Sequence, residues 1–153
     1  MRLVAMAGVI LASVLFSLTA WSTTVEPDRT MKETKKEKNS FSLTTTDVKA
    51  TVGATANTWV HVTPGKGYKW NLEYPAKLTI AGVPSHVKLA KTIFKQLKGD
   101  FKATEKKASV KVAMVGTSAG TETLTGKLKL SVCDANVCHI EKADVKFTVT
   151  IAP

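Results

Sequence analysis

The sequence predicts an all-β domain built as a sandwich of two sheets, behind an apolar leader and a polar tether. Short runs in which apolar and polar residues alternate recur from Thr45 to the C-terminal end, and a period of two is typical of strands buried on one face. Turn-forming residues separate these runs at short intervals, and the sequence contains no internal repeat. With 153 residues, 44% of them hydrophobic, the chain has room for one such domain plus a leader.

The N-terminal end has the pattern of an export signal. Met1 and Arg2 form a short positive segment, and residues 3–20 are apolar and uncharged. Cleavage is expected after Ala20 or Ser22. Because the apolar run is nearly long enough to span a bilayer, an uncleaved anchor in the inner membrane is the alternative. We therefore assign residues 1–22 to a signal peptide or an N-terminal anchor helix, and we expect a periplasmic or secreted protein that touches the membrane only through this segment.

Residues 23–42 are polar, mixed in charge and poor in apolar side chains, which is typical of a flexible linker. The folded domain is therefore expected over residues 43–153. The alternating runs predict about seven or eight strands, the clearest of them over residues 48–52, 55–63, 76–80, 87–89, 110–114, 124–132 and 144–151.

Two segments between these strands lack the alternation. The aromatic-rich stretch from Tyr68 to Tyr74 is expected to fill the core at the ends of strands. In residues 90–101 the apolar side chains fall at near-helical spacing, which predicts a single helical turn or a long loop.

The chain is strongly basic, with a formal net charge of +10. Residues 1–22 contain one charge, Arg2, so the remainder has 21 basic and 12 acidic residues, or +9. Such a balance attracts polyanions, but export makes nucleic acid an unsuitable partner, and we expect none. The lysines between residues 88 and 107 are spread through polar positions, which indicates a solvated face; contact with anionic lipid or an acidic partner is the alternative.

The only two cysteines, Cys133 and Cys138, interrupt two strand-like runs that together predict a hairpin. A four-residue connection sets them opposite each other, where Cα separations of about 4.5–5.5 Å suit a disulfide, and an exported chain can keep one. A disulfide across so short a loop stabilises by only about 2 kcal/mol. The alternation places Cys133 on a polar face with Lys127 and Lys129, where a thiolate is favoured. A structural bridge and a redox-active bridge both remain open.

Other chemistry has little support in the sequence. Cys133, Cys138 and His139 are too few for a usual metal site, and no nucleophile elbow, paired-carboxylate motif or nucleotide loop occurs. We therefore expect no cofactor and no bound metal. His139, next to Cys138, either stabilises a thiolate or is an exposed loop residue.

The stretch from Leu128 to Cys138, near the end of an exported β-sandwich, resembles the signature of the N-terminal (alpha) domain of the thiol:disulfide interchange protein DsbD. In that family a strand runs into a cysteine, a polar loop, a hydrophobic residue, a second cysteine and a final strand. Upstream, Gly67 to Asn71 and Pro75 to Leu78 are similar to the family's turn and strand. The resemblance covers residues 43–153.

The resemblance implies an immunoglobulin-like periplasmic sandwich whose cysteine pair relays electrons between a membrane-embedded donor and thioredoxin-like proteins. Cys138 would enter mixed disulfides and Cys133 would resolve them. An aromatic cap shields the pair in the family, and Phe101 and Phe94 are the candidates here. The chain departs from the family after Cys138, where His139 to Lys142 replace the usual prolines, and in having no transmembrane or thioredoxin-like domain before Pro153.

Two functions are therefore expected from the sequence. The first is a component of a thiol:disulfide oxidoreductase system that works through Cys133 and Cys138. The alternative is a non-enzymatic binding or assembly module with a structural disulfide, which contacts its partner through the lysine-rich face or the region of Trp59 and Trp70.

Overall fold

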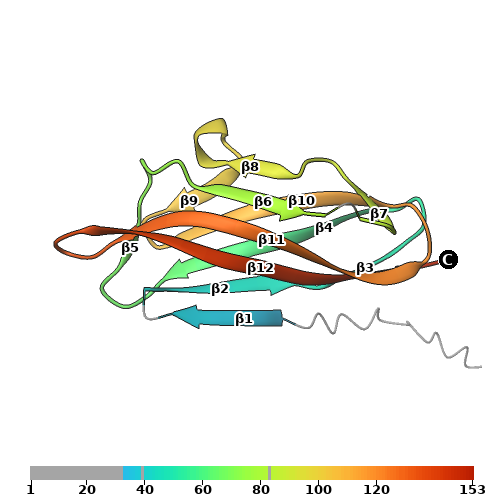
Figure 1. The fold of residues 1–153 in the computed structure, drawn as a ribbon, viewed down its shortest axis with the longest axis horizontal. Helices are drawn as coiled ribbons and strands as arrows, with labels where there is room; N and C mark the ends of the chain where they lie inside the picture. The colour runs from blue at the N-terminus through green and yellow to red at the C-terminus, as the bar shows by residue number, and fades with distance from the viewer. Residues whose placement is uncertain (1–32, 39, 83) are drawn as a thin grey trace, which may run out of the picture.

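The computed structural model describes residues 33–38, 40–82 and 84–153, and it confirms the prediction of an immunoglobulin-like sandwich of two β-sheets. The two layers of strands lie face to face in Figure 1. The first sheet has the order β1-β2-β4-β10-β7, with β9 also paired to β10, and the second has the order β3-β12-β11-β6-β8, with β5 also paired to β11.

The described strands have the following bounds. The first sheet contains β1 (Glu33–Lys38), β2 (Phe41–Thr46), β4 (Thr55–Pro64), β7 (Val87–Leu89), β9 (Phe101–Thr104) and β10 (Lys107–Gly116). The second sheet contains β3 (Val48–Thr51), β5 (Lys69–Trp70), β6 (Lys77–Ala81), β8 (Ile93–Lys95), β11 (Gly120–Cys133) and β12 (Cys138–Ala152).

The chain passes from the first sheet to the second at Asp47. Strand β2 pairs with β4, whereas β3, which follows at once, runs parallel to the last residues of β12. The Asp47 carboxylate accepts a hydrogen bond from the backbone N–H of Thr148 at 2.6 Å, which fixes the crossing. One continuous segment therefore contributes a strand to each layer and ties the layers together at the edge of the sandwich.

The core lies between the sheets because alternate side chains of the long strands point inward. On β11 and β12 these include Leu128, Leu130, Val145 and Phe147, all 1% exposed or less, in accord with the alternation of the sequence. Trp70 is 2% exposed, which confirms that the aromatic-rich stretch supplies a core residue. One face of the long β11–β12 hairpin therefore packs against the core, and the other face is exposed to solvent.

Strand β1 corrects the predicted boundary between tether and domain. Residues 33–38 were expected in the flexible linker, but they pair with β2 from Glu33↔Thr46 to Lys38↔Phe41, and β2 itself begins at Phe41. The linker was assigned from its lack of apolar residues, yet the backbone hydrogen bonds of an edge strand do not require apolar side chains. The sandwich therefore begins before residue 43.

The segment 90–101 contains both a strand and the expected helical turn. Strand β8 pairs with β6, and the 3₁₀-helix η1 (Gln96–Lys98) follows it and ends at Gly99, which has φ +78°. Only one side chain of β8, Phe94, is buried, so a period of two could not be recognised over three residues.

The predicted leader, residues 1–22, lies outside the described residues, as does the first part of the tether. Within the described part of the chain, no helix is long and apolar enough to cross a membrane.

Candidate functional site

Cys133 and Cys138 are joined by a disulfide at the tip of the β11–β12 hairpin. They are the last residue of β11 and the first of β12, they are partners in the strand register, and their Cα atoms are 3.8 Å apart, closer than the spacing expected from the sequence. In Figure 1 this tip projects at the left end of the sandwich, opposite the C-terminus. The prediction of a hairpin closed by a disulfide is confirmed.

Asp134 shapes the loop between the cysteines. Its Oδ1 atom accepts hydrogen bonds from the backbone N–H groups of Asn136 at 2.8 Å and Val137 at 2.9 Å. Its own N–H donates to the Val137 carbonyl at 3.0 Å. Aspartate favours such turns because its short side chain reaches the backbone two residues ahead. The four residues between the cysteines are therefore held in one compact turn.

His139 is joined to the same carboxylate. Its Nε2 atom lies 2.8 Å from Asp134 Oδ2, and the ring of Tyr68 packs edge-on against the imidazole with centroids 5.8 Å apart. The hydrogen bond with His139, followed by the N–H groups of Asn136 and Val137, lowers the pKa of Asp134 from 3.8 to about 2. His139 is the register partner of the buried Val132, so it lies on the opposite face of the hairpin from the two sulfurs and contacts the loop instead.

The two cysteines differ in accessibility: Cys138 is exposed, whereas Cys133 is half-buried. Strand β5 lies beside Cys133, with Lys69 as the register partner of this cysteine. The backbone N–H of Asn71, directly after β5, donates to the Ser131 carbonyl at 3.0 Å. A partner molecule approaching the tip of the hairpin therefore meets Cys138 first.

Gln96 fixes the connection between β5 and β6, which lies beside the end of β11. Its Oε1 atom accepts a hydrogen bond from Trp70 Nε1 at 2.8 Å, and its Nε2 group donates to the carbonyls of Asn71 at 3.2 Å and Leu72 at 2.5 Å. The side chain of η1 thus ties the β5–β6 connection to the core through Trp70. Hydrogen bonds therefore hold the backbone beside Cys133 in place.

Phe94 and Phe101, the residues expected to form an aromatic cap, are instead part of the core. They are 5% and 8% exposed. Phe94 lies opposite Leu78 in the β6–β8 pair, and Phe101 stacks on Trp70 with centroids 6.1 Å apart. Two large aliphatic side chains are exposed near the disulfide: Val137 is 54% exposed and Ile140 is 62% exposed.

Sequence reasoning missed the roles of Asp134 and Lys69. An aspartate two residues before an asparagine, between two strands, is a turn signal, and it could have identified Asp134. Lys69 is 64 positions from Cys133 and reaches it only through the pairing of β5 with β11, so no local signal marks it.

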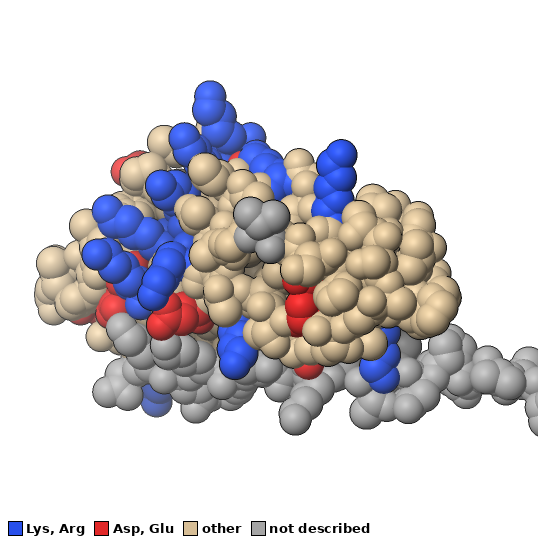
Figure 2. Space-filling view, turned by 45° about the vertical axis from the view of Figure 1, so that its right-hand side comes forward, with Lys and Arg blue, Asp and Glu red and all other residues tan. Residues whose placement is uncertain are grey.

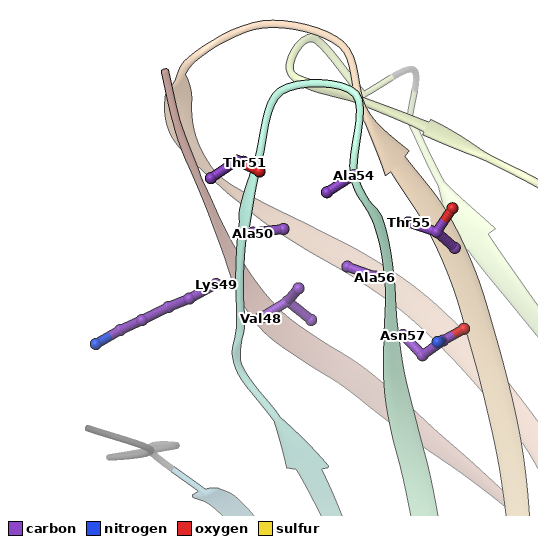
Figure 3. Close-up of a pocket in the computed structure, with 8 residues that line it drawn as sticks. All are labelled: Val48, Lys49, Ala50, Thr51, Ala54, Thr55, Ala56 and Asn57. Atoms are coloured by element: carbon purple, nitrogen blue, oxygen red, sulfur yellow. The ribbon is translucent and has the colours of Figure 1, made fainter. Parts of the chain in front are cut away.

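A hollow of about 590 Å³ lies between β3 and β4 (Figure 3). Val48, Ala50, Ala54 and Ala56 point toward one another across it, while Lys49 points away. Strand β3 pairs with residues 149–152, at the far end of β12 from Cys138. The lining has no nucleophile, acid or base directed inward, so it lacks the groups that a catalytic site needs. Elsewhere in the described residues, no three His, Cys, Asp or Glu side chains come together as metal ligands.

Comparisons with known proteins give structural likenesses alone. No family model and no curated protein matches the sequence. Among solved structures, the N-terminal periplasmic domain of ScsB from Proteus mirabilis is 13% identical with a TM-score of 0.47, over 76% of this chain and 49% of that one, so the chain spans about half of its length.

Two further solved structures resemble the chain more weakly. AggA, the major subunit of aggregative adherence fimbriae type I from Escherichia coli, is 11% identical with a TM-score of 0.40, over 79% of this chain and 96% of that one. The PapD-like domain 7 of human CEP192 is 8% identical with a TM-score of 0.36, over 88% of this chain and 98% of that one. Likenesses at this level do not decide a function.

Proposed function

We propose that the protein is a thiol-disulfide exchange module of the periplasm, which relays electrons through Cys133 and Cys138. The observation that carries the proposal is the unequal exposure of the disulfide: Cys138 is exposed at the tip of a hairpin, and Cys133 is half-buried beside β5. A bridge whose only task is to staple a hairpin needs no such access. Exchange requires one sulfur that an incoming thiolate can reach.

Reduction of the module proceeds in two steps that the geometry supports. The thiolate of a thioredoxin-like partner attacks Cys138 Sγ, the Cys133–Cys138 bond breaks, and Cys133 leaves as a thiolate that takes up a proton. The second thiolate of the partner then attacks the mixed disulfide at the partner's own sulfur and releases Cys138. Two electrons pass from the partner's dithiol, which becomes a disulfide, to the cysteine pair. Oxidation of the module by an acceptor is the reverse sequence.

Cys133 is the leaving group in the first step because the partner attacks the more exposed sulfur, that of Cys138. Lys69, the register partner of Cys133, forms an ion pair with Glu105, with 3.0 Å between Lys69 Nζ and Glu105 Oε2. In this account electrons pass to or from thioredoxin-like proteins, and a membrane-embedded protein is a further electron donor.

The proposal is tested by trapping mixed disulfides with single-cysteine variants. Cys133→Ala leaves the exposed Cys138. Its thiolate is expected to form a covalent species with a thioredoxin-like protein whose resolving cysteine has been removed and whose remaining cysteine carries a 5-thio-2-nitrobenzoate group, which leaves as the free thiolate. Cys138→Ala is the matched control, since it leaves a cysteine of the same hairpin that is half-buried, and it is expected to react several times more slowly. If neither variant reacts faster than an unfolded cysteine peptide at equal concentration, the disulfide is structural and the alternative of a stapled binding module stands.

A further inference from the structure

Four lysines form a row across the outer face of the second sheet, which is the face turned away from the core. Lys95 of β8 is the register partner of Lys77 of β6, Lys77 is the partner of Lys129 of β11, and Lys129 is the partner of Lys142 of β12. All four side chains are exposed. Since neighbouring strands are about 4.8 Å apart, the lysine row spans about 14 Å.

The row sets like charges directly opposite each other, which is unfavourable for the sheet. The neighbouring carboxylate, Asp144, pairs with Lys127 at 2.5 Å and so neutralises a lysine outside the row. In the described part of the chain, none of the four lysines of the row takes part in an ion pair; Lys129 has its Nζ 6.0 Å from the ring of Tyr74. The arrangement leaves a concentrated positive charge that an anionic partner would neutralise.

The lysine row and the disulfide lie on the same face of the β11–β12 hairpin. Side chains two residues apart on a strand share a face, so Cys138, Ile140 and Lys142 stand in line along β12. Four residues of strand place Lys142 about 13 Å from Cys138, and the exposed Ile140 lies between them. A hollow of about 570 Å³, lined by Lys77, Lys127, Lys129 and Lys142 among others, opens on this face.

Positive charge gathers over one part of the surface. In Figure 2 lysine and arginine side chains crowd the left half of the visible face, whereas the right half consists largely of other residue types. The sequence analysis had considered the lysines between residues 88 and 107, for which contact with an acidic partner was the alternative to a solvated face; of these, Lys95 belongs to the row.

We propose that this face docks the exchange partner, and that the partner is a protein with carboxylates on its surface beside its reactive cysteine. The inference rests on the proposed function. A protein partner that covers a usual area of about 800 Å² on each side extends about 16 Å from the centre of contact. A partner centred on Cys138 therefore also covers Ile140, Lys142 and Lys129, the end of the lysine row nearer to the disulfide. Charge complementarity would speed its approach and fix its orientation, as in other charged interfaces.

The test compares exchange rates in two variants of the full chain that lose the same charge. Lys129→Gln with Lys142→Gln removes half of the row. Lys88→Gln with Lys111→Gln removes two exposed lysines from the outer face of the first sheet. The probes are a reduced thioredoxin of net negative charge and the neutral dithiol dithiothreitol, and vesicles of phosphatidylglycerol report binding to anionic lipid.

The row variant is expected to lose about tenfold in the rate with the acidic thioredoxin at low ionic strength, with the difference gone at about 1 M salt. Its rate with dithiothreitol and the rates of the first-sheet variant should match those of the wild-type chain. Equal rates for the row variant and the wild type with thioredoxin would overturn the docking face and leave the exchange function intact. If that variant instead loses only vesicle binding, the row is a lipid surface and the inference is wrong. If neither thioredoxin nor dithiothreitol reduces the chain, both the proposed function and this inference are wrong.

Discussion

At the scale of single residues, Asp134 is the side chain that gives the cysteine loop its shape. One oxygen accepts two backbone hydrogen bonds inside the loop, and the other binds His139 on the far face of the hairpin. Each of these contacts favours the ionised carboxyl group, which is why the pKa falls to about 2. The conformation of the loop is thereby coupled to the charge of one half-buried acid.

This coupling predicts how the loop responds to acid. Because the pKa of Asp134 is lower in the folded chain than its ordinary value of 3.8, its contribution to stability is complete above about pH 4 and is lost as the pH falls toward 2. An NMR titration should find the carboxyl midpoint near pH 2, and His139→Ala should move it upward without restoring the ordinary value, since the two N–H donors remain. An unchanged midpoint in His139→Ala would show that the imidazole does not stabilise the carboxylate.

At the scale of the strands, the register of the second sheet decides which side chains act together. The lysine row exists because β8, β6, β11 and β12 are neighbours in this order. Residues 77, 95, 129 and 142 are far apart in the sequence, and no local pattern marks them as neighbours. Alternation placed Lys77 and Lys129 on the outer faces of their expected strands, whereas Lys95 and Lys142 lie outside the expected strands, and the row itself follows from strand order and alignment.

The row predicts a substitution that stabilises the sheet. Lys77→Glu replaces two like-charge pairs, with Lys95 and Lys129, by two opposite-charge pairs, and it is expected to raise the free energy of unfolding by about 0.5 kcal/mol at low salt. Urea denaturation measures the change. Lys111→Glu is the control, since its partner on β4 is Trp59. A loss of stability in Lys77→Glu, or an equal gain in Lys111→Glu, would contradict the account of the row.

Close packing of β11 against β6 gives a second prediction for the strands. A Cβ atom at Gly126 would lie 2.8 Å from the carbonyl oxygen of Thr79, a backbone atom that cannot turn aside. Gly126→Ala should therefore lower the free energy of unfolding by about 1–3 kcal/mol, as overpacking does elsewhere. Gly67→Ala would not serve as a control because its φ of +81° is strained for alanine, so Thr125→Ala, exposed on the same strand, is the better comparison.

At the scale of the whole molecule, the sandwich is held by its core and not by the disulfide. The fully buried side chains come from both sheets and include Phe41, Val60, Leu130 and Phe147. The disulfide joins residues only five positions apart, so it restricts the unfolded chain little. Both redox forms of the protein should therefore share one fold, which an exchange module needs in order to cycle.

Reduction of the bridge should accordingly cost about 2 kcal/mol of stability and leave the sandwich folded. Urea unfolding of the oxidised and the reduced chain measures the difference, with Cys133→Ala/Cys138→Ala as the control for effects of the reductant. A reduced chain that is unfolded without urea would show that the bridge is required for the fold.

Much of this architecture could be predicted from the sequence, and the misses have common physical causes. Long runs such as residues 124–132 and 144–151 alternate clearly, so the sandwich, the hairpin and the facing cysteines were foreseen. Strands β1, β5, β8 and β9 were missed because they are short or polar and depend on pairing with a longer strand. Strand β2 was missed because it begins at Phe41, inside the segment assigned to the linker. Phe94 and Phe101 were misplaced because an aromatic in an irregular segment has the same local signal whether it fills the core or covers a site.

The measurement that tests the central claim most directly is the reduction potential of the Cys133–Cys138 bridge in the folded chain, at equilibrium with a thioredoxin-like protein. The account predicts a value above about −300 mV, in the range where exchange proteins donate and accept electrons. A bridge with a potential below this limit, which the thioredoxin-like protein leaves oxidised, would be a structural disulfide, and the exchange function would be wrong.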